Sequence, residues 1–174
     1  LGALYLVFII NSALIWLPNI VNSILFFTAA AIHYIRVIRC RFWVTFRTPL
    51  VWSLHLSYSF IPTGLLLFGI SLISDAINSS QAIHTITVGA IGMMILSMIS
   101  RVSLGHTGRP IKVGKLMTSA FIVLLLAALV RIFGQLFTDD YIFVILSSAI
   151  LWAIAYACFV VLYALILIKK RINI

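Results

Sequence analysis

Acidic residues are nearly absent from this sequence. Among 174 residues there are three Asp or Glu side chains, which are Asp75, Asp139 and Asp140. They stand in short polar segments between long apolar runs. Acid–base catalysis needs a titratable group held at a substrate, and the sequence shows neither a Ser-His-Asp pattern nor a glycine-rich phosphate loop. The chain offers metal ligands and cations, but little catalytic equipment of its own.

Cysteine is scarce as well, with two in the chain. Cys40 stands at the basic end of a predicted helix, and Cys158 lies inside an apolar run. Neither belongs to a CxxC motif, and the pair does not resemble a disulfide framework. We therefore expect both to be unpaired, with Cys158 filling a helix interface.

Charge of either sign is rare, and apolar residues take its place. Charged residues make up 9% of the chain and apolar residues 64%, with a mean hydropathy of +1.24, whereas soluble domains are about 25% charged. The apolar residues form continuous runs of membrane-spanning length rather than an alternating pattern, which excludes a β-barrel. We expect an all-α, polytopic transmembrane helix bundle with six spans, at about 1–17, 20–38, 50–73, 82–101, 114–136 and 141–168.

The positive charge is distributed unevenly between the predicted loops. The net charge of +9 is compatible with nucleic-acid binding, but the basic residues lie in short loops, where membrane topology places them. If the six spans alternate, eleven of the twelve basic residues share one side: Arg36, Arg39, Arg41, Arg47, Arg101, Arg109, Lys112, Lys115, Lys169, Lys170 and Arg171. The positive-inside rule makes that side, and the C-terminus, cytoplasmic. We expect the partner to be a lipid bilayer and not a nucleic acid.

The sequence begins within an apolar run, LGALYLVFII, without an initiating Met or a charged segment before it. Because this is not the pattern of a natural start, we expect the chain to be part of a longer polytopic protein whose N-terminal half is missing here.

Four histidines are candidate ligands, and helix geometry separates them by depth. His33, His55 and His106 are predicted near the cytoplasmic ends of their spans, with His106 in a loop after a helix that ends at Arg101. His84 is predicted at the outer end, about 25 Å away at 1.5 Å per residue. Imidazole ligates haem iron and copper. The alternative is that each ring merely bonds a backbone carbonyl or a lipid headgroup.

Three arginines lie close to these histidines in the sequence. Arg101 and Arg109 flank His106 and match the two propionates of a haem, because a guanidinium pairs with carboxylates through two N–H groups. Anchoring of the helix to anionic lipid explains them more simply. Arg131 is the one basic residue predicted on the acidic side, and we expect it to pair with Asp139 or Asp140, with an outer-face propionate as the alternative.

Small and soft side chains in the fourth and fifth spans favour packing over ligation. Gly89 and Gly92 lie one turn apart, as expected where helices approach closely. The four methionines suggest copper through thioether ligation, but filling of core gaps is the commoner role for methionine. They are Met93, Met94, Met98 and Met117.

Three stretches resemble the NnrS family of membrane proteins. The stretch AIHTITVGAIGMMILSMISRVSLGHTGRPI (82–111) is the most specific, and TPLVWSLHLSYSFIPTGLLLFG (48–69) and IHYIRVIRCRFW (32–43) support it. Where the family usually has MMTR, this chain reads MISR at 98–101, which keeps Arg101.

The resemblance implies a multi-pass protein of the bacterial inner membrane, about twice as long as this chain. It implies haem of the b type, copper as a further cofactor, and a role in nitric oxide metabolism or resistance to nitrosative stress, with a diatomic ligand such as nitric oxide. The matched motifs carry His55, His84 and His106 as metal ligands, with His33 as an addition. Arg101 and Arg109 are cofactor-binding candidates because of their position beside His106.

Two other functions are compatible with the sequence. One is half of a multi-pass transporter or permease, which would be expected to show broken helices and a charge at mid-membrane. The other is a structural or assembly subunit. A Soret absorption band in the purified protein distinguishes the haem hypothesis from both.

Overall fold

The computed structural model describes residues 18–171, which are almost entirely helical. Within this range there is no strand, and five helical segments are long and apolar enough to cross a membrane. The all-α, multi-pass architecture is therefore confirmed, with five of the six expected spans in place. The expected span at 1–17 lies outside the described residues.

The spans are four single helices and one composite helix. The composite span contains an α-helical turn, a π-helical segment and a longer α-helix in direct succession. The elements are α2 (Asn19–Arg39), η1 (Phe42–Thr45), α3 (Pro49–Ser71), α4 (Ser79–His84), η2 (Thr85–Gly92), α5 (Met93–His106), α6 (Lys115–Phe133), η3 (Gly134–Leu136) and α7 (Tyr141–Ile168).

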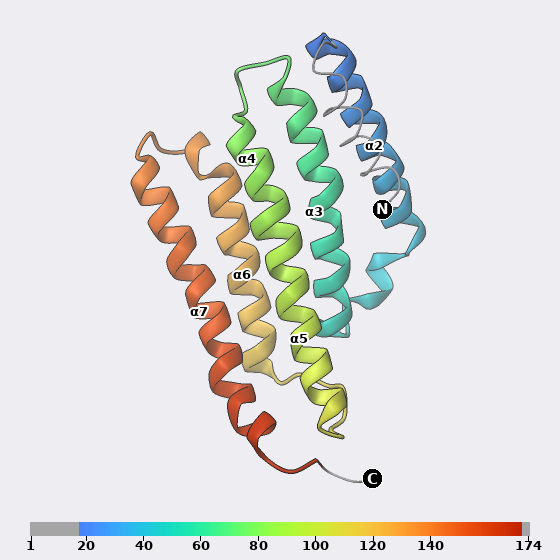
Figure 1. Cartoon of the computed structure of the whole chain (residues 1–174), viewed down its shortest axis with the longest axis vertical. Helices are drawn as coiled ribbons and strands as arrows, with labels where there is room; N and C mark the ends of the chain where they lie inside the picture. The colour runs from blue at the N-terminus through green and yellow to red at the C-terminus, as the bar shows by residue number, and fades with distance from the viewer. Residues whose placement is uncertain (1–17, 172–174) are drawn as a thin grey trace.

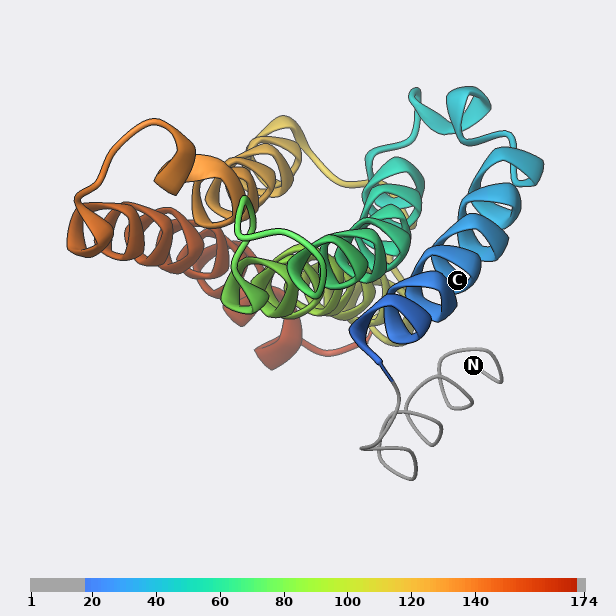
Figure 2. The ribbon, with the colours of Figure 1, turned by 90° about the horizontal axis from the view of Figure 1, so that it is seen from above.

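The helices stand side by side along one axis (Figure 1). Seen from above, they form an open, curved arrangement with α2 at one edge and α7 at the other (Figure 2). The edge helix α2 packs against α3, and α7 packs against α6 and α5. Among the described elements, α2 therefore has one main neighbour, which is α3.

Small residues allow the central helices to approach closely. A Cβ added at Gly89 would lie 2.6 Å from Cγ of Phe60 on α3, and one at Gly64 would lie 2.5 Å from Cγ1 of Ile86. Real Cβ atoms do not approach that closely, so both positions require glycine unless the neighbour moves. The predicted packing role of Gly89 is thereby confirmed. Of the methionines, Met93 and Met117 are buried in the core, as expected.

The composite span is longer than the sequence predicted at both ends. It begins at Ser79, where Asn78 and Gln81 form a capping box. The prediction that it ends at Arg101 is wrong, because the helix continues through Gly105 to His106.

Gly108 ends this helix with a left-handed φ of 69°. Two hydrogen bonds complete the turn, from Arg109 N–H to Leu104 O (3.0 Å) and from Gly108 N–H to Gly105 O (3.2 Å). This is a Schellman motif, in which the residue after the cap takes the conformation that glycine adopts most easily. His106 is therefore a helical residue and not part of the loop.

The loops alternate between the two ends of the bundle (Figure 1). The α2–α3 and α5–α6 connections and the C-terminal end lie toward one end, and the α3–α4 and α6–α7 connections lie at the other. The basic loop residues therefore gather toward one end and the three aspartates at the opposite end. The arrangement fits a multi-pass membrane protein.

Candidate functional site

A histidine–tyrosine pair joins the edge helix α2 to α3. Nδ1 of His33 lies 2.7 Å from the hydroxyl oxygen of Tyr58, within hydrogen-bonding distance. The two rings are tilted by 55°, with their centroids 5.8 Å apart. His33 is 2% exposed, so the bond holds a buried ring in one orientation.

The second nitrogen of this ring has no partner. Nε2 of His33 is buried, and it is the one buried side-chain nitrogen or oxygen in the described residues that lacks a hydrogen bond. Leaving a buried polar atom unsatisfied costs about 1–3 kcal/mol, so such atoms in native proteins call for an explanation. An imidazole with one nitrogen bonded and the other free is arranged as metal-bound histidines are.

A groove of about 510 Å³ runs along the same side of the α2–α3 pair. Three residues of α2 line the groove one and two turns after His33: Arg36, Val37 and Cys40. His33 therefore lies on the same face of α2, at the end of the groove nearer the start of that helix. Tyr58 lines the groove as well and links it directly to the buried ring. The walls are mainly apolar and include Arg36, Cys40, Val51, Leu54, His55, Tyr58 and Met94.

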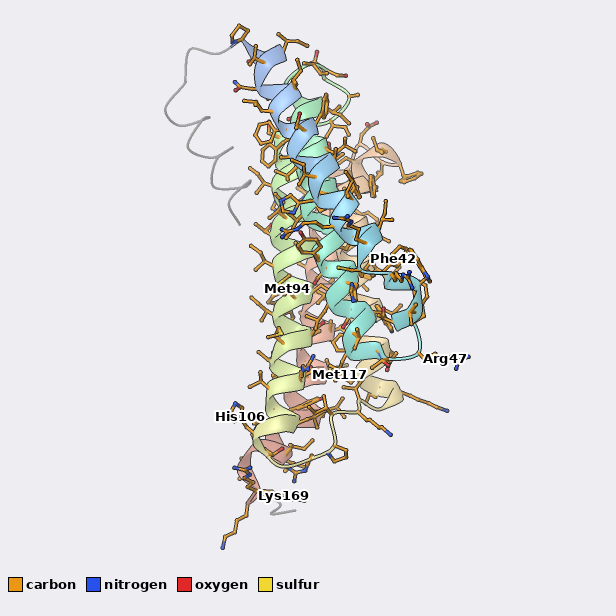
Figure 3. The ribbon with its side chains drawn as sticks, turned by 90° about the vertical axis from the view of Figure 1, so that its right-hand side faces the viewer. Phe42, Arg47, Met94, His106, Met117 and Lys169 are labelled. Atoms are coloured by element: carbon orange, nitrogen blue, oxygen red, sulfur yellow. The ribbon has the colours of Figure 1, made fainter. Side chains whose placement is uncertain are left out.

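A second hollow of about 400 Å³ lies against α2, η1 and α3. His55 and Val37 border both spaces, so these residues form part of the wall between them. Figure 3 shows Phe42, which lines the second hollow, on the opposite side of the α2–α3 pair from Met94, which lines the groove. His55 is half-buried and makes no hydrogen bond within residues 18–171.

His84 stands at the other end of the bundle, in contact with an arginine. The guanidinium Nη2 of Arg131 lies 2.6 Å from Nε2 of His84. Because arginine has no acceptor, Nε2 accepts this hydrogen bond and its lone pair is occupied. The same Nη2 lies 3.4 Å from the hydroxyl of Tyr141, and the guanidinium carbon lies 5.5 Å from the centre of the Tyr141 ring.

The predicted pairing of Arg131 with Asp139 or Asp140 is therefore wrong. Asp140 instead caps α7, where its Oδ1 accepts a hydrogen bond from Phe143 N–H at 3.0 Å. An N-cap carboxylate satisfies an otherwise free helical N–H and also stabilises the helix dipole. Asp140 therefore caps the helix that follows it, and Arg131 contacts His84 and Tyr141 instead.

His106 lies far from His33 and His55. It is the exposed last residue of α5, twelve residues after Met94, or about 18 Å along the helix. Figure 3 shows His106 farther toward the C-terminal end of α5 than Met94. Of the three histidines predicted at one level, His55 lines the groove, His33 contacts the groove residue Tyr58, and His106 lies away from both.

The arginines near His106 also differ from each other. Arg101 is exposed on α5. Arg109 is half-buried, and its Nη1 donates a hydrogen bond to the carbonyl oxygen of Ile166 at 3.1 Å. Arg109 thereby satisfies a carbonyl in the last turn of α7 and places a positive charge where the helix dipole favours it.

Sequence reasoning missed the groove residues other than the histidines. Tyr58 follows His55 by three residues, which puts both on one helix face, and this spacing was the available signal. The roles of Arg36, Cys40 and Met94 depend on how the helices pack and leave no mark in the local sequence. Within the described residues, no three His, Cys, Asp or Glu side chains lie close enough to share one metal ion.

Comparison with known proteins supports the family resemblance. A family model described as NnrS protein matches residues 1–171 of the 174-residue chain. Searches of curated proteins and of solved structures return no match. Because the family model covers nearly the whole chain, the chain belongs to the NnrS family.

Proposed function

We propose that this chain is a haem-binding membrane protein of nitric oxide metabolism, and that His33 is the iron ligand. Membership of the NnrS family is consistent with a membrane protein related to nitric oxide. The haem and the ligand are our proposal. The observation that carries it is the buried, unpartnered Nε2 of His33.

The surroundings of His33 fit a haem ligand. Nδ1 is within hydrogen-bonding distance of Tyr58, which fixes the plane of the ring and leaves Nε2 as the coordinating atom. The ring is buried, so water does not compete for the free nitrogen. A haem bound here would supply an iron centre with affinity for diatomic ligands.

The groove beside His33 fits the rest of a haem. Its walls are mostly apolar, with Val51 and Leu54 on α3 and Met94 on α5. The guanidinium of Arg36 lies on the same face of α2, one turn after His33, and it suits a propionate. His55 lines the groove and would be a second imidazole available to hold the haem.

Copper is a second candidate cofactor for the same groove. Cys40, His55 and Met94 line it together, and they supply the thiolate, imidazole and thioether groups that copper favours. A copper site here would use His55 and the two sulfur atoms. It would leave His33 free for haem.

The remaining predicted site residues have weaker support as ligands. Nε2 of His84 is already bonded to Arg131, which leaves Nδ1 as its free nitrogen. His106 and Arg101 are exposed, and Arg109 bonds the end of α7. The variants His84→Ala, His106→Ala and Arg109→Ala test the predicted cofactor roles of these three residues.

The location follows from charge and family. We propose the bacterial inner membrane, with the basic ends of the helices and the C-terminus in the cytoplasm. The groove would then open near the cytoplasmic side. The proposal includes a further, N-terminal half of the protein as a partner in forming the complete site.

The experiment is optical spectroscopy of the full-length protein, purified in detergent from cells well supplied with haem. We expect a Soret band that is lost in His33→Ala and weakened or shifted in Tyr58→Phe. The matched control is His106→Ala, which removes an exposed histidine from the same protein and should leave the band unchanged.

Two results would contradict or redirect the proposal, and a third tests the copper site. A wild-type protein without haem would exclude it and favour the transporter hypothesis. A Soret band that survives in His33→Ala but is lost in His84→Ala would move the site to the other end of the bundle. Copper that is present in the wild type and absent in Cys40→Ser would support the second cofactor independently of the haem.

A further inference from the structure

We infer that the hollow between α2, η1 and α3 binds a membrane-soluble quinone. This aromatic hollow has a volume of about 400 Å³, and the residues that matter here are Tyr34, Ile38, Phe42, Phe46, Trp52 and His55. It is separate from the groove of the proposed haem site and lies across the α2–α3 pair from it. The inference assigns His55 to the quinone in place of a role as a metal ligand, and it leaves His33 as the proposed haem ligand.

The walls of the hollow are aromatic and are held in place. Phe42 and Phe46 pack edge to face, with their ring centres 5.9 Å apart. Trp52 packs edge to face against the core residue Phe121, at 6.2 Å. Rings fixed in this way provide flat apolar faces against which another ring can stack.

Most polar groups around the hollow already have hydrogen-bond partners. The hydroxyl of Tyr34 lies 2.8 Å from Oγ1 of Thr63, Ser59 donates to the carbonyl of Leu56, and Thr45 donates to the carbonyl of Phe42. Bonded side chains of this kind gain little from a ligand.

Two nitrogen-bearing side chains in the wall, the imidazole of His55 and the indole of Trp52, lack such hydrogen-bond partners in the described residues. They lie three residues apart on α3 and therefore share a helix face. A ligand for this hollow is an apolar ring that carries an oxygen able to accept a hydrogen bond.

The position of the hollow suits a ligand that arrives through the bilayer. It lies at the end of α2, beside the cationic stretch that contains Arg39, Arg41 and Arg47. Ile38 and Phe46 on its border are 58% and 62% exposed. Tryptophan and tyrosine, here Trp52 and Tyr34, are typical of the membrane–water boundary.

Anchoring at that boundary does not account for the hollow by itself. Trp43 and Val44 of η1 are 50% and 68% exposed, and they serve as outward-facing anchors. Phe42 and Phe46 flank them and line the concave side. A lipid tail would fill the apolar volume but would leave the imidazole of His55 unused, whereas a quinone carbonyl would accept its N–H.

The test measures binding of decylubiquinone to the full-length protein in phosphatidylcholine nanodiscs, with empty nanodiscs as the baseline. Ile38→Trp narrows the mouth of the hollow at an exposed site, and His55→Leu removes the hydrogen bond. We expect each to weaken binding about tenfold, the order of effect of one lost hydrogen bond with its contacts. The matched control is Val51→Trp, which fills the groove on the other side and should leave quinone affinity within about twofold.

The outcomes separate this inference from the haem proposal. The quinone inference is supported if the wild type binds quinone above the baseline and Ile38→Trp weakens that binding, whether or not the protein carries haem. Binding equal to empty nanodiscs overturns it, and so does binding that Ile38→Trp leaves unchanged. Phospholipid without quinone in the organic extract of protein purified from quinone-containing membranes would identify a lipid tail as the occupant and would also overturn it.

Discussion

Removing the His33–Tyr58 pair should cost the haem-free protein little or nothing. In the double variant His33→Leu, Tyr58→Phe, a leucine of similar size replaces the ring, and the tyrosine loses its hydroxyl. The variant loses one side-chain contact of 2.7 Å, and in membrane proteins such bonds contribute about 0.6–2 kcal/mol. It also removes the buried, unpartnered Nε2, whose burial costs about 1–3 kcal/mol. The two terms oppose each other, so we expect a change between about 1 kcal/mol of destabilisation and about 2 kcal/mol of stabilisation.

The assay is reversible unfolding of haem-free protein in mixed micelles, followed by circular dichroism. The matched control is Ser53→Ala, because the hydroxyls of Ser97 and Ser53 form a buried hydrogen bond of 2.8 Å with no unsatisfied atom. The control should lose about 0.6–2 kcal/mol of stability. Haem binding, measured in the same preparations, should be lost in the double variant and retained in Ser53→Ala.

The reasoning fails if the double variant loses more than about 2 kcal/mol in the absence of haem. Such a loss exceeds the value of one hydrogen bond in a membrane, and it would mean that His33 and Tyr58 serve the fold. If His33 and Tyr58 are retained to bind a ligand, replacing them should abolish binding without a large loss of stability, because function is often kept at the expense of stability.

Two further predictions concern packing and helix ends. Gly89→Ala should destabilise the protein by about 1–3 kcal/mol because its Cβ meets Phe60, whereas Gly92→Ala, with its nearest neighbour at 3.5 Å, should cost less than about 1 kcal/mol in the same unfolding assay. Equal effects at the two positions would refute the packing argument. Arg109→Ala should cost about 1–2 kcal/mol and speed hydrogen exchange in the last turn of α7, because the carbonyl of Ile166 loses its partner. If hydrogen exchange in the last turn of α7 is unchanged in Arg109→Ala but the Soret absorption is lost, Arg109 serves the cofactor instead.

The spans could be predicted because their signal is local. Runs of about twenty apolar residues place a helix without knowledge of its neighbours, and the five described spans fall where the sequence put them. The error at His106 arose because two glycines near a helix end look alike in a sequence. The chain turns at Gly108, which has the positive φ, and continues through Gly105, which does not.

The candidate site could be predicted only in part because it depends on register between helices. His33 and His55 were identified as ligand candidates, but the contact of His33 with Tyr58 spans 25 residues and requires a particular offset of α2 against α3. The partner of Arg131 was misjudged for a related reason. Sequence proximity favoured the aspartates, whereas capping of α7 occupied Asp140 and tertiary packing brought His84 within 2.6 Å.

Rescue of a haem-binding defect by free imidazole tests the central claim most directly. His33→Gly leaves space where the buried ring stood, and a small imidazole can enter that space and coordinate the iron in place of Nε2. The account predicts that His33→Gly protein lacks the Soret band and regains it when haem and millimolar imidazole are added together. A band that is present in His33→Gly without imidazole, or one that imidazole does not restore, would contradict the assignment of His33 as the ligand.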